Sequence, residues 1–129
     1  MTSYLDASAF VKLVIEEPES ETLQAFVDGS DSIASSALTR AEAVRAVRHK
    51  GPDALLGIRE MLQAIDLVPV DEEILDAAGL LDPGILRTLD AIHLATAIAI
   101  GDDLDVVVTY DGRMLQAAAL LGLPTTSPT

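Results

Sequence analysis

The sequence contains no cysteine and no tryptophan, and aromatic residues make up only 3% of its 129 positions. The absence of cysteine excludes a disulfide framework and any zinc site built on thiolates. It also suits a reducing compartment. No basic segment followed by a long apolar stretch opens the sequence, so no secretory signal is expected. We therefore expect a cytoplasmic protein.

Long hydrophobic runs are also missing. The most apolar stretch, AIHLATAIAIG at residues 91–101, is too short to span a bilayer and lies between Asp90 and Asp102. No membrane association is therefore expected. Half of the residues are hydrophobic, which is enough for a folded core, and no linker, repeat or low-complexity segment divides the chain. We expect residues 1–129 to form a single domain.

Positive charge is scarce. Eight Lys and Arg residues stand against 21 Asp and Glu residues, which gives a formal net charge of −13. Such a balance argues against binding nucleic acid by broad neutralisation of phosphates, and it favours cations or a basic partner. Half of the basic residues are clustered beside His49; they are Arg40, Arg45, Arg48 and Lys50. Composition alone leaves open whether this cluster is a solvated helix face or a binding surface.

Short strand-like runs alternate with longer helical patterns along the chain. Strands are expected at residues 3–5, 31–35, 66–70, 105–109 and 123–127. Helices are expected at residues 7–15, 17–29, 39–51, 53–65, 71–81, 88–101 and 111–122. Pro69 indicates an edge strand, and the helix at 88–101 is apolar on nearly every side and should be buried. The alternation predicts a three-layer α/β domain with a parallel sheet.

Four acidic residues fall where such a sheet binds its ligands, beyond the carboxyl ends of the strands. Asp6 ends the first strand, and Asp111 follows the strongest strand. Glu42 and Asp90 each lie near the start of a helix. All four side chains could therefore face one edge of the sheet.

Each acid also has a purely structural interpretation. Asp6 and Asp111 are suited to cap the helices that follow them, and Asp90 would be favourable in the first turn of its helix. Thr39 and Glu42 have the spacing of a capping box. Taken singly, the structural interpretation is preferred for Glu42 and Asp111, and the choice stays open for Asp6 and Asp90.

Taken together, the acids favour a metal site. Two carboxylates at 4 Å repel each other by about 4 kcal/mol at an effective dielectric near 20. A hard divalent cation such as Mg²⁺ or Mn²⁺ removes this repulsion and prefers oxygen ligands. No local metal-binding motif is present, so the spacing alone does not establish the site.

Four segments resemble one known family. They are YLDASAFVKL, SALTRAEAVRAV, RTLDAIHLATA and VVVTYDGRMLQAA, at residues 4–13, 36–47, 87–97 and 106–118. In this order they resemble the PIN-domain ribonucleases, and most closely the VapC toxins of bacterial type II toxin–antitoxin systems. The resemblance implies a PIN-like three-layer α/β/α fold with a short, mostly parallel sheet.

The resemblance also implies a function. It is that of a Mg²⁺-dependent endoribonuclease, with Mn²⁺ as a substitute, in which a metal-activated water attacks an RNA phosphodiester. Asp6 and Asp90 would be the firmest metal ligands, and Glu42 and Asp111 would complete the site directly or through waters. The implied partners are RNA, a VapB-like antitoxin with a basic tail, and a second copy of the chain in a homodimer that joins the antitoxin in a hetero-oligomer.

Other polar residues have lesser roles in this interpretation. Ser8 and Thr109 could orient a carboxylate or a metal-bound water, although helix capping explains Ser8 equally well. Arg87 is a candidate for a phosphate contact, and Arg40 belongs to the basic cluster that an RNA substrate would need nearby. For His93, a hydrogen-bonded histidine in a buried helix is preferred over a role beside the acids.

Two alternatives belong to other classes. A receiver-like module that binds Mg²⁺ for phosphorylation requires a second acid beside Asp6 and a Lys after the last strand, and neither is present; an Asp-x-Asp phosphatase fails for the same reason. A PIN-like protein without activity is disfavoured by the presence of all four acids. The early helices also carry apolar residues that could serve a dimer or the antitoxin, with core packing as the default; they are Phe10, Leu13, Val14, Leu23, Phe26 and Val27.

Overall fold

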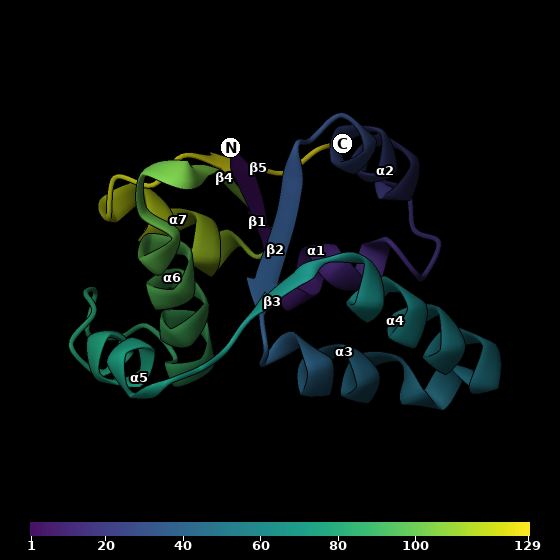
Figure 1. The fold of residues 1–129 in the computed structure, drawn as a ribbon, viewed down its shortest axis with the longest axis horizontal. Coiled ribbons are helices and arrows are strands. Elements are labelled where there is room, and N and C mark those ends of the chain that lie inside the picture. The colour runs from purple at the N-terminus through teal and green to yellow at the C-terminus, as the bar shows by residue number, and fades with distance from the viewer.

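A computed structural model describes all residues from 1 to 129 and shows one five-stranded sheet in the order β3-β2-β1-β4-β5 (Figure 1). All four strand pairings are parallel. The strands are β1 (Thr2–Leu5), β2 (Ser32–Ser36), β3 (Asp66–Val68), β4 (Leu104–Val108) and β5 (Thr125–Thr126). The five expected strands are confirmed, each within a few residues of its expected bounds.

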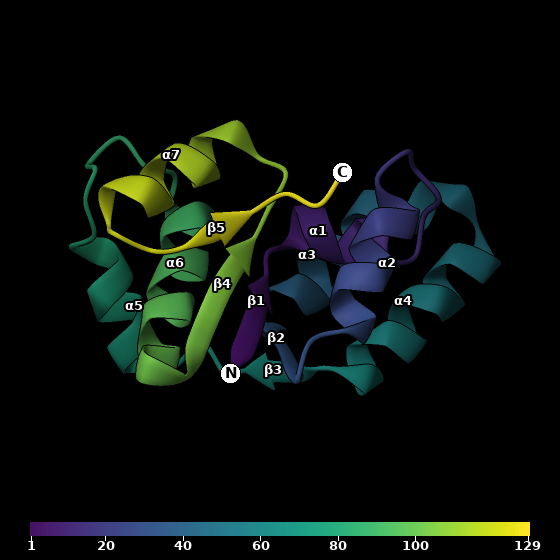
Figure 2. The same ribbon diagram turned by 90° about the horizontal axis from the view of Figure 1, so that it is seen from above.

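Helices cover both faces of the sheet. In Figure 2, α1 to α4 lie on one side of the strands and α5 to α7 on the other. They are α1 (Ala7–Lys12), α2 (Ser20–Asp28), α3 (Thr39–Val47), α4 (Pro52–Ala64), α5 (Glu72–Gly79), α6 (Thr88–Ile100) and α7 (Gly112–Leu120). Two 3₁₀ turns, η1 (Arg48–Lys50) and η2 (Gly101–Asp103), extend α3 and α6. The three-layer α/β/α fold predicted from the alternation is confirmed.

The order of the strands reverses between β1 and β4. The chain winds from β1 outward to β2 and β3, and then crosses over to β4 and β5 on the other side of β1. The register pairs Tyr4 with Val107 and Leu5 with Val108, so the two central strands end together. In parallel sheets such a reversal point is where a ligand site forms, because the connections leave the sheet in opposite directions there.

The core follows the expected hydrophobic pattern. All four residues of β1 are buried, and α6 buries a continuous run from Ala91 to Ala97. β3 lies at the edge of the sheet, with Pro69 just beyond its last residue, as expected of a residue that cannot donate a ladder hydrogen bond. The apolar residues of the early helices pack in this core, since Phe10 and Leu23 are buried and none of the six is exposed.

One helix is shorter than expected. The apolar pattern predicts a helix to residue 15, but α1 ends at Lys12. The hydroxyl of Ser20 donates to the carbonyls of Lys12 and Ile15, at 2.7 Å and 3.2 Å. These contacts satisfy carbonyl groups at the end of the helix and let the chain turn toward α2. None of the helices is long and apolar enough to cross a membrane.

Candidate active site

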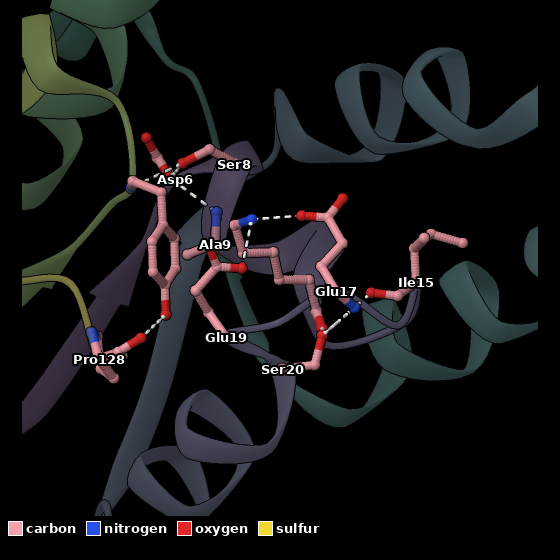
Figure 3. A network of polar contacts seen from close by, with 10 residues as sticks. Asp6, Ser8, Ala9, Ile15, Glu17, Glu19, Ser20 and Pro128 are labelled. Carbon is pink, nitrogen blue, oxygen red and sulfur yellow. Dashed lines mark hydrogen bonds and ion pairs between the residues drawn. The ribbon is translucent and has the colours of Figure 1, made fainter.

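Asp6 is a buried carboxylate at the point where β1 meets α1, and only 4% of its surface is exposed. Its Oδ1 atom accepts hydrogen bonds from the Ser8 hydroxyl at 2.6 Å and the Ala9 backbone N–H at 3.0 Å, and its Oδ2 atom accepts one from the Thr109 hydroxyl at 2.5 Å. Figure 3 shows Asp6 between Ser8 and Ala9. Three donors therefore hold this carboxylate in one orientation.

No Lys or Arg pairs with Asp6. Lys12, the nearest basic residue in sequence, forms ion pairs with Glu17 and Glu19 instead (Figure 3). Its ammonium group also lies 5.0 Å from the centre of the Tyr110 ring. The structural interpretation of Asp6 as an N-cap is thus confirmed, and the capping leaves its charge without a cationic partner.

Thr109 connects Asp6 to Asp111. The Thr109 hydroxyl donates to Asp6 and accepts from the Asp111 backbone N–H at 3.1 Å. Asp111 in turn caps α7 by accepting from the Arg113 N–H at 2.9 Å, as its structural interpretation predicts. The ends of β1 and β4 are therefore joined through one hydroxyl, and the structure places Thr109 where it orients Asp6.

Asp90 lies in the first turn of α6 and is half-buried. Burial raises the pKa of its carboxyl, the charge of Asp111 raises it further, and the charge of Asp6 adds to this; Arg87 and His93 oppose the shift. No hydrogen bond contributes to stabilising the Asp90 charge. The three aspartates therefore share one electrostatic environment, in which Asp90 is the least compensated.

Glu42 does not form the capping box that its spacing with Thr39 predicts. Leu38 is the N-cap of α3 and provides no side-chain hydrogen bond. Thr39 is fully buried and its hydroxyl contacts Ser35 at 2.7 Å. The Glu42 carboxylate instead contacts His93 Nε2 at 2.6 Å. The capping-box interpretation is wrong because tertiary partners on β2 and α6 take both side chains.

His93 makes a contact that the sequence reasoning considered but did not prefer. The preferred interpretation, a hydrogen-bonded histidine in a buried helix, is confirmed, since His93 is 2% exposed and both ring nitrogens have partners. One of these partners, however, is a candidate site residue. The signal in the sequence was the three-residue spacing from Asp90, which places both side chains on neighbouring positions of α6.

The four acids surround the end of the sheet without forming a closed ligand set. No three of the Asp, Glu and His side chains lie in an arrangement that could hold one metal ion. Three of the four acids accept hydrogen bonds from protein donors: Asp6 and Asp111 from residues near them in sequence, and Glu42 from His93 on α6. Asp90 has no such hydrogen bond, and burial together with the charges of Asp111 and Asp6 raises the pKa of its carboxyl.

A hollow of about 430 Å³ opens beside Asp90. Arg87 and Arg113 line it, and both are exposed. Its rim includes two strongly exposed apolar side chains, Ile85 at 94% and Leu120 at 76%. Arg87 thus lies where the sequence placed it, beside Asp90. Arg113 was missed, since its place opposite Arg87 depends on how α7 packs against α6.

Arg40 is exposed in the first turn of α3, two residues before Glu42. Arg45, Arg48 and Lys50 are exposed farther along α3 and η1. Apart from Lys12, no Lys or Arg side chain forms an ion pair, although the chain holds 21 acidic residues. The basic groups therefore remain accessible to an anionic ligand.

Comparison with known proteins agrees with this arrangement. The model of the PIN domain matches residues 3–120, so the chain belongs to the PIN-domain family. Its curated relatives include Ribonuclease VapC46 of Mycobacterium tuberculosis, which is 50% identical over 97% of this chain and 96% of the relative. Ribonuclease VapC47 of Mycobacterium tuberculosis is 39% identical over the same shares. The VapC-type PIN domain that the four sequence segments predict is confirmed, and the receiver-like alternative is set aside.

Solved structures show the same fold. VapC20 of Mycobacterium tuberculosis, a toxin that cleaves the sarcin–ricin loop, matches 98% of this chain and 99% of its own with a TM-score of 0.76 at 14% identity. VapBC2 from Rickettsia felis, bound to a DNA fragment from its promoter, gives a TM-score of 0.74 at 16% identity and covers 100% of both chains. The fold is therefore shared along the whole length.

Proposed function

We propose that the protein is the toxin of a type II toxin–antitoxin pair, and that it hydrolyses RNA phosphodiester bonds as a Mg²⁺-dependent endoribonuclease. The observation that carries the proposal is the raised pKa of the Asp90 carboxyl. Burial and the charges of Asp111 and Asp6 raise this pKa, and no hydrogen bond to the carboxylate opposes the shift. The names of the full-length relatives, all VapC ribonucleases, support the same activity.

The chemistry of the donor set fits a hard divalent cation, although no three of these side chains are already placed to hold one ion. The candidate ligands are carboxylate oxygens, with hydroxyls next to them, and no soft ligand is present because the chain has no cysteine. Asp6 and Asp90 would hold the ion, and Asp111 and Glu42 would complete the site directly or through waters. When bound, a divalent cation lowers the pKa of a coordinated water and stabilises charge on a phosphoryl group.

The chain's own residues prepare this site. Ser8 and Thr109 fix both oxygens of Asp6, so its carboxylate loses little rotational freedom when it binds a ligand. Thr109 also holds the backbone at Asp111, which keeps the ends of β1 and β4 in register. Mn²⁺ prefers the same oxygen ligands as Mg²⁺ and should substitute for it.

The arginines that form no ion pair are the proposed contacts for the RNA substrate. Arg87 and Arg113 line the hollow beside Asp90 and would contact phosphates on either side of the scissile bond. Arg40 lies near Glu42 on α3 and would extend this positive surface. The acidic remainder of the surface limits binding to this region.

We also propose a VapB-like antitoxin as the partner, with a homodimer of the toxin joining it in a hetero-oligomer. The net charge of −13 favours a partner with a basic segment, because opposite charges accelerate association and disfavour wrong partners. Chains in the solved structures of FitAB bound to DNA and of a toxin–antitoxin complex from Klebsiella pneumoniae have the same fold.

Cleavage of RNA by the purified protein tests the proposed activity. Activity is expected with Mg²⁺ or Mn²⁺ and none with EDTA. Asp6→Asn and Asp90→Asn should each reduce kcat/KM by about 100-fold or more, since each removes a ligand charge. Asp53→Asn, an exposed carboxylate on α4, serves as the matched control and should retain activity.

Cleavage that continues in EDTA would contradict the metal dependence. Parental rates in both site variants would show that the reaction does not occur at these residues.

A further inference from the structure

Three polar side chains from three different elements form a line behind the acidic site. The Tyr4 hydroxyl on β1 lies 2.7 Å from His93 Nδ1 on α6, and His93 Nε2 lies 2.6 Å from Glu42 Oε1 on α3. Tyr4 and His93 are 0% and 2% exposed, whereas the Glu42 side chain is 26% exposed. The line therefore runs from the core outward to the surface of the site.

The chemistry of the groups orients the hydrogen bonds. An ionised carboxylate only accepts, so Nε2 carries the hydrogen in the contact with Glu42. The Tyr4 hydroxyl is protonated, because burial and the charges of Asp6 and Glu42 raise the pKa of its phenol well above the usual value. Donation from the Tyr4 hydroxyl to Nδ1 then gives each of the three groups a hydrogen-bond partner.

The imidazole cannot turn freely. It meets the Tyr4 ring edge to face, with 6.0 Å between ring centres and 68° between planes. A rotation about its side-chain torsions would leave buried polar groups without partners, which is costly in a closely packed core. The Nε2–H group therefore points in one fixed direction.

Glu42 is the group whose position this line decides. Its own helix does not hold its carboxylate, since α3 has no side-chain cap, and its hydrogen bond comes from His93 instead. Its contact is with α6, the helix that also carries Asp90. His93 thus connects α3, which carries Glu42, to α6, which carries Asp90.

We propose that His93, oriented from behind by Tyr4, is a positioning residue that holds the Glu42 carboxylate at the metal site. This role rests on the proposed function and assigns His93 an effect on metal affinity that acts through Glu42. Such partners of metal ligands fix the ligand's orientation and raise its effectiveness.

Binding of Mn²⁺ to the purified full-length protein, measured by calorimetry and by the paramagnetic resonance signal of free Mn²⁺, tests the proposal. His93→Leu removes the donor at similar volume and should weaken Mn²⁺ binding about tenfold. His93→Gln retains an N–H donor that can reach Glu42 and should restore affinity to within about threefold of the parent. Asp71→Ala removes the cap of α5, so it should lower the Tm without changing Mn²⁺ affinity.

A double-mutant cycle separates positioning from general damage. If His93 acts through Glu42, the variant Glu42→Gln with His93→Leu should bind Mn²⁺ no more weakly than Glu42→Gln alone. A full additional tenfold loss in the double variant would overturn the proposal, and so would parental affinity in His93→Leu. If His93→Leu does not fold, the cycle is run with His93→Gln, and any loss of Mn²⁺ affinity in Glu42→Gln with His93→Gln beyond that of Glu42→Gln alone would overturn the proposal as well.

The outcome also distinguishes this role from the proposed function. A parent protein that binds no Mn²⁺ and cleaves no RNA overturns the metal-dependent ribonuclease itself. A parent that does both, together with a His93→Leu variant that matches it, overturns only the positioning role.

Discussion

Asp6 shows how a buried carboxylate is tolerated without a basic neighbour. Its charge is dispersed over two hydroxyl donors and one backbone N–H, from Ser8 and Ala9 in the first turn of α1 and from Thr109 just after β4. A fixed Lys or Arg would neutralise Asp6 equally well, but it would compete with a metal ion for the same oxygens. Hydrogen bonds stabilise the charge and leave lone pairs directed at the site.

Asp90 has the opposite character, and its raised pKa has a consequence for stability. The folded protein holds a proton on Asp90 at a pH where the unfolded chain has already released it. Stability therefore falls as the pH rises from the ordinary carboxyl pKa through the raised one. At neutral pH, in the absence of metal, the ionised Asp90 destabilises the fold.

We predict that Asp90→Asn increases the Tm at pH 7 in EDTA. With Mg²⁺ present, the same variant should lose RNA cleavage. The gain should be at most about 1 kcal/mol, because Asp90 is only half-buried and solvent screens its neighbours. Thermal unfolding between pH 7 and pH 3 measures it, and the difference from the parent should shrink as the pH falls through the raised pKa of Asp90 and the folded protein takes up the proton.

Glu60→Gln is the matched control, since it makes the same change in net charge at an exposed position in the middle of α4. An Asp90→Asn variant less stable than the parent at pH 7 would show that the charge of Asp90 is compensated in the folded protein.

At the scale of elements, the close approach of α4 to the segment after α1 depends on Gly57. A Cβ atom at position 57 would lie 2.8 Å from Cγ1 of Val14, which is closer than real contacts allow. Val14 is β-branched and has few rotamers with which to move away. The small side chain at this point therefore sets the distance between the two segments.

We predict that Gly57→Ala destabilises the protein by about 1 kcal/mol. The overlap with Val14 costs about 1–3 kcal/mol, and the better helix propensity of Ala offsets up to about 1 kcal/mol of it. Urea denaturation gives the free energy of unfolding.

Gly79→Ala is the control, because it is also a Gly-to-Ala change in a helix but has nothing within 4 Å of the added Cβ. It should be neutral or stabilising. Adding Val14→Ala to Gly57→Ala should relieve the overlap; if the pair is no better than the simple sum of the two changes, the contact is not the cause.

At the scale of the whole molecule, charge is distributed unevenly. The chain carries a net charge of −13, yet its arginines are left unpaired and two of them border the hollow beside Asp90. The acidic surface keeps nucleic acid away from most of the protein. An RNA substrate is then expected to make few phosphate contacts, so the loss of one contact should measurably weaken RNA binding.

We predict that Arg113→Gln weakens RNA binding several-fold and reduces the slope of log Kd against log salt by about one. The measurement uses the non-cleaving Asp6→Asn background, so that binding is separated from hydrolysis. Arg59→Gln, an exposed arginine on α4 that does not line the hollow, should leave the slope unchanged. Equal slopes for parent and Arg113→Gln would show that this side chain contacts no phosphate.

Local patterns determined much of this protein. Strands and helices alternate as the hydrophobic periodicity predicts, and Pro69 marks an edge strand because proline lacks a ladder donor. Asp6 and Asp111 cap their helices as their positions predict, since capping depends only on neighbours in sequence. Four sequence segments were sufficient to indicate the family.

Tertiary structure decided the contacts that join distant segments. Glu42 has the spacing of a capping box, but His93, 51 residues away, provides a stronger partner and redirects its carboxylate. The helix after β1 ends early, where Ser20 donates to the carbonyl of its last residue, Lys12, and to that of Ile15 beyond it. Arg113 faces the hollow only because α7 packs beside α6. Local propensities are worth tenths of a kcal/mol to about 1 kcal/mol, so a buried hydrogen bond between distant residues readily overrides them.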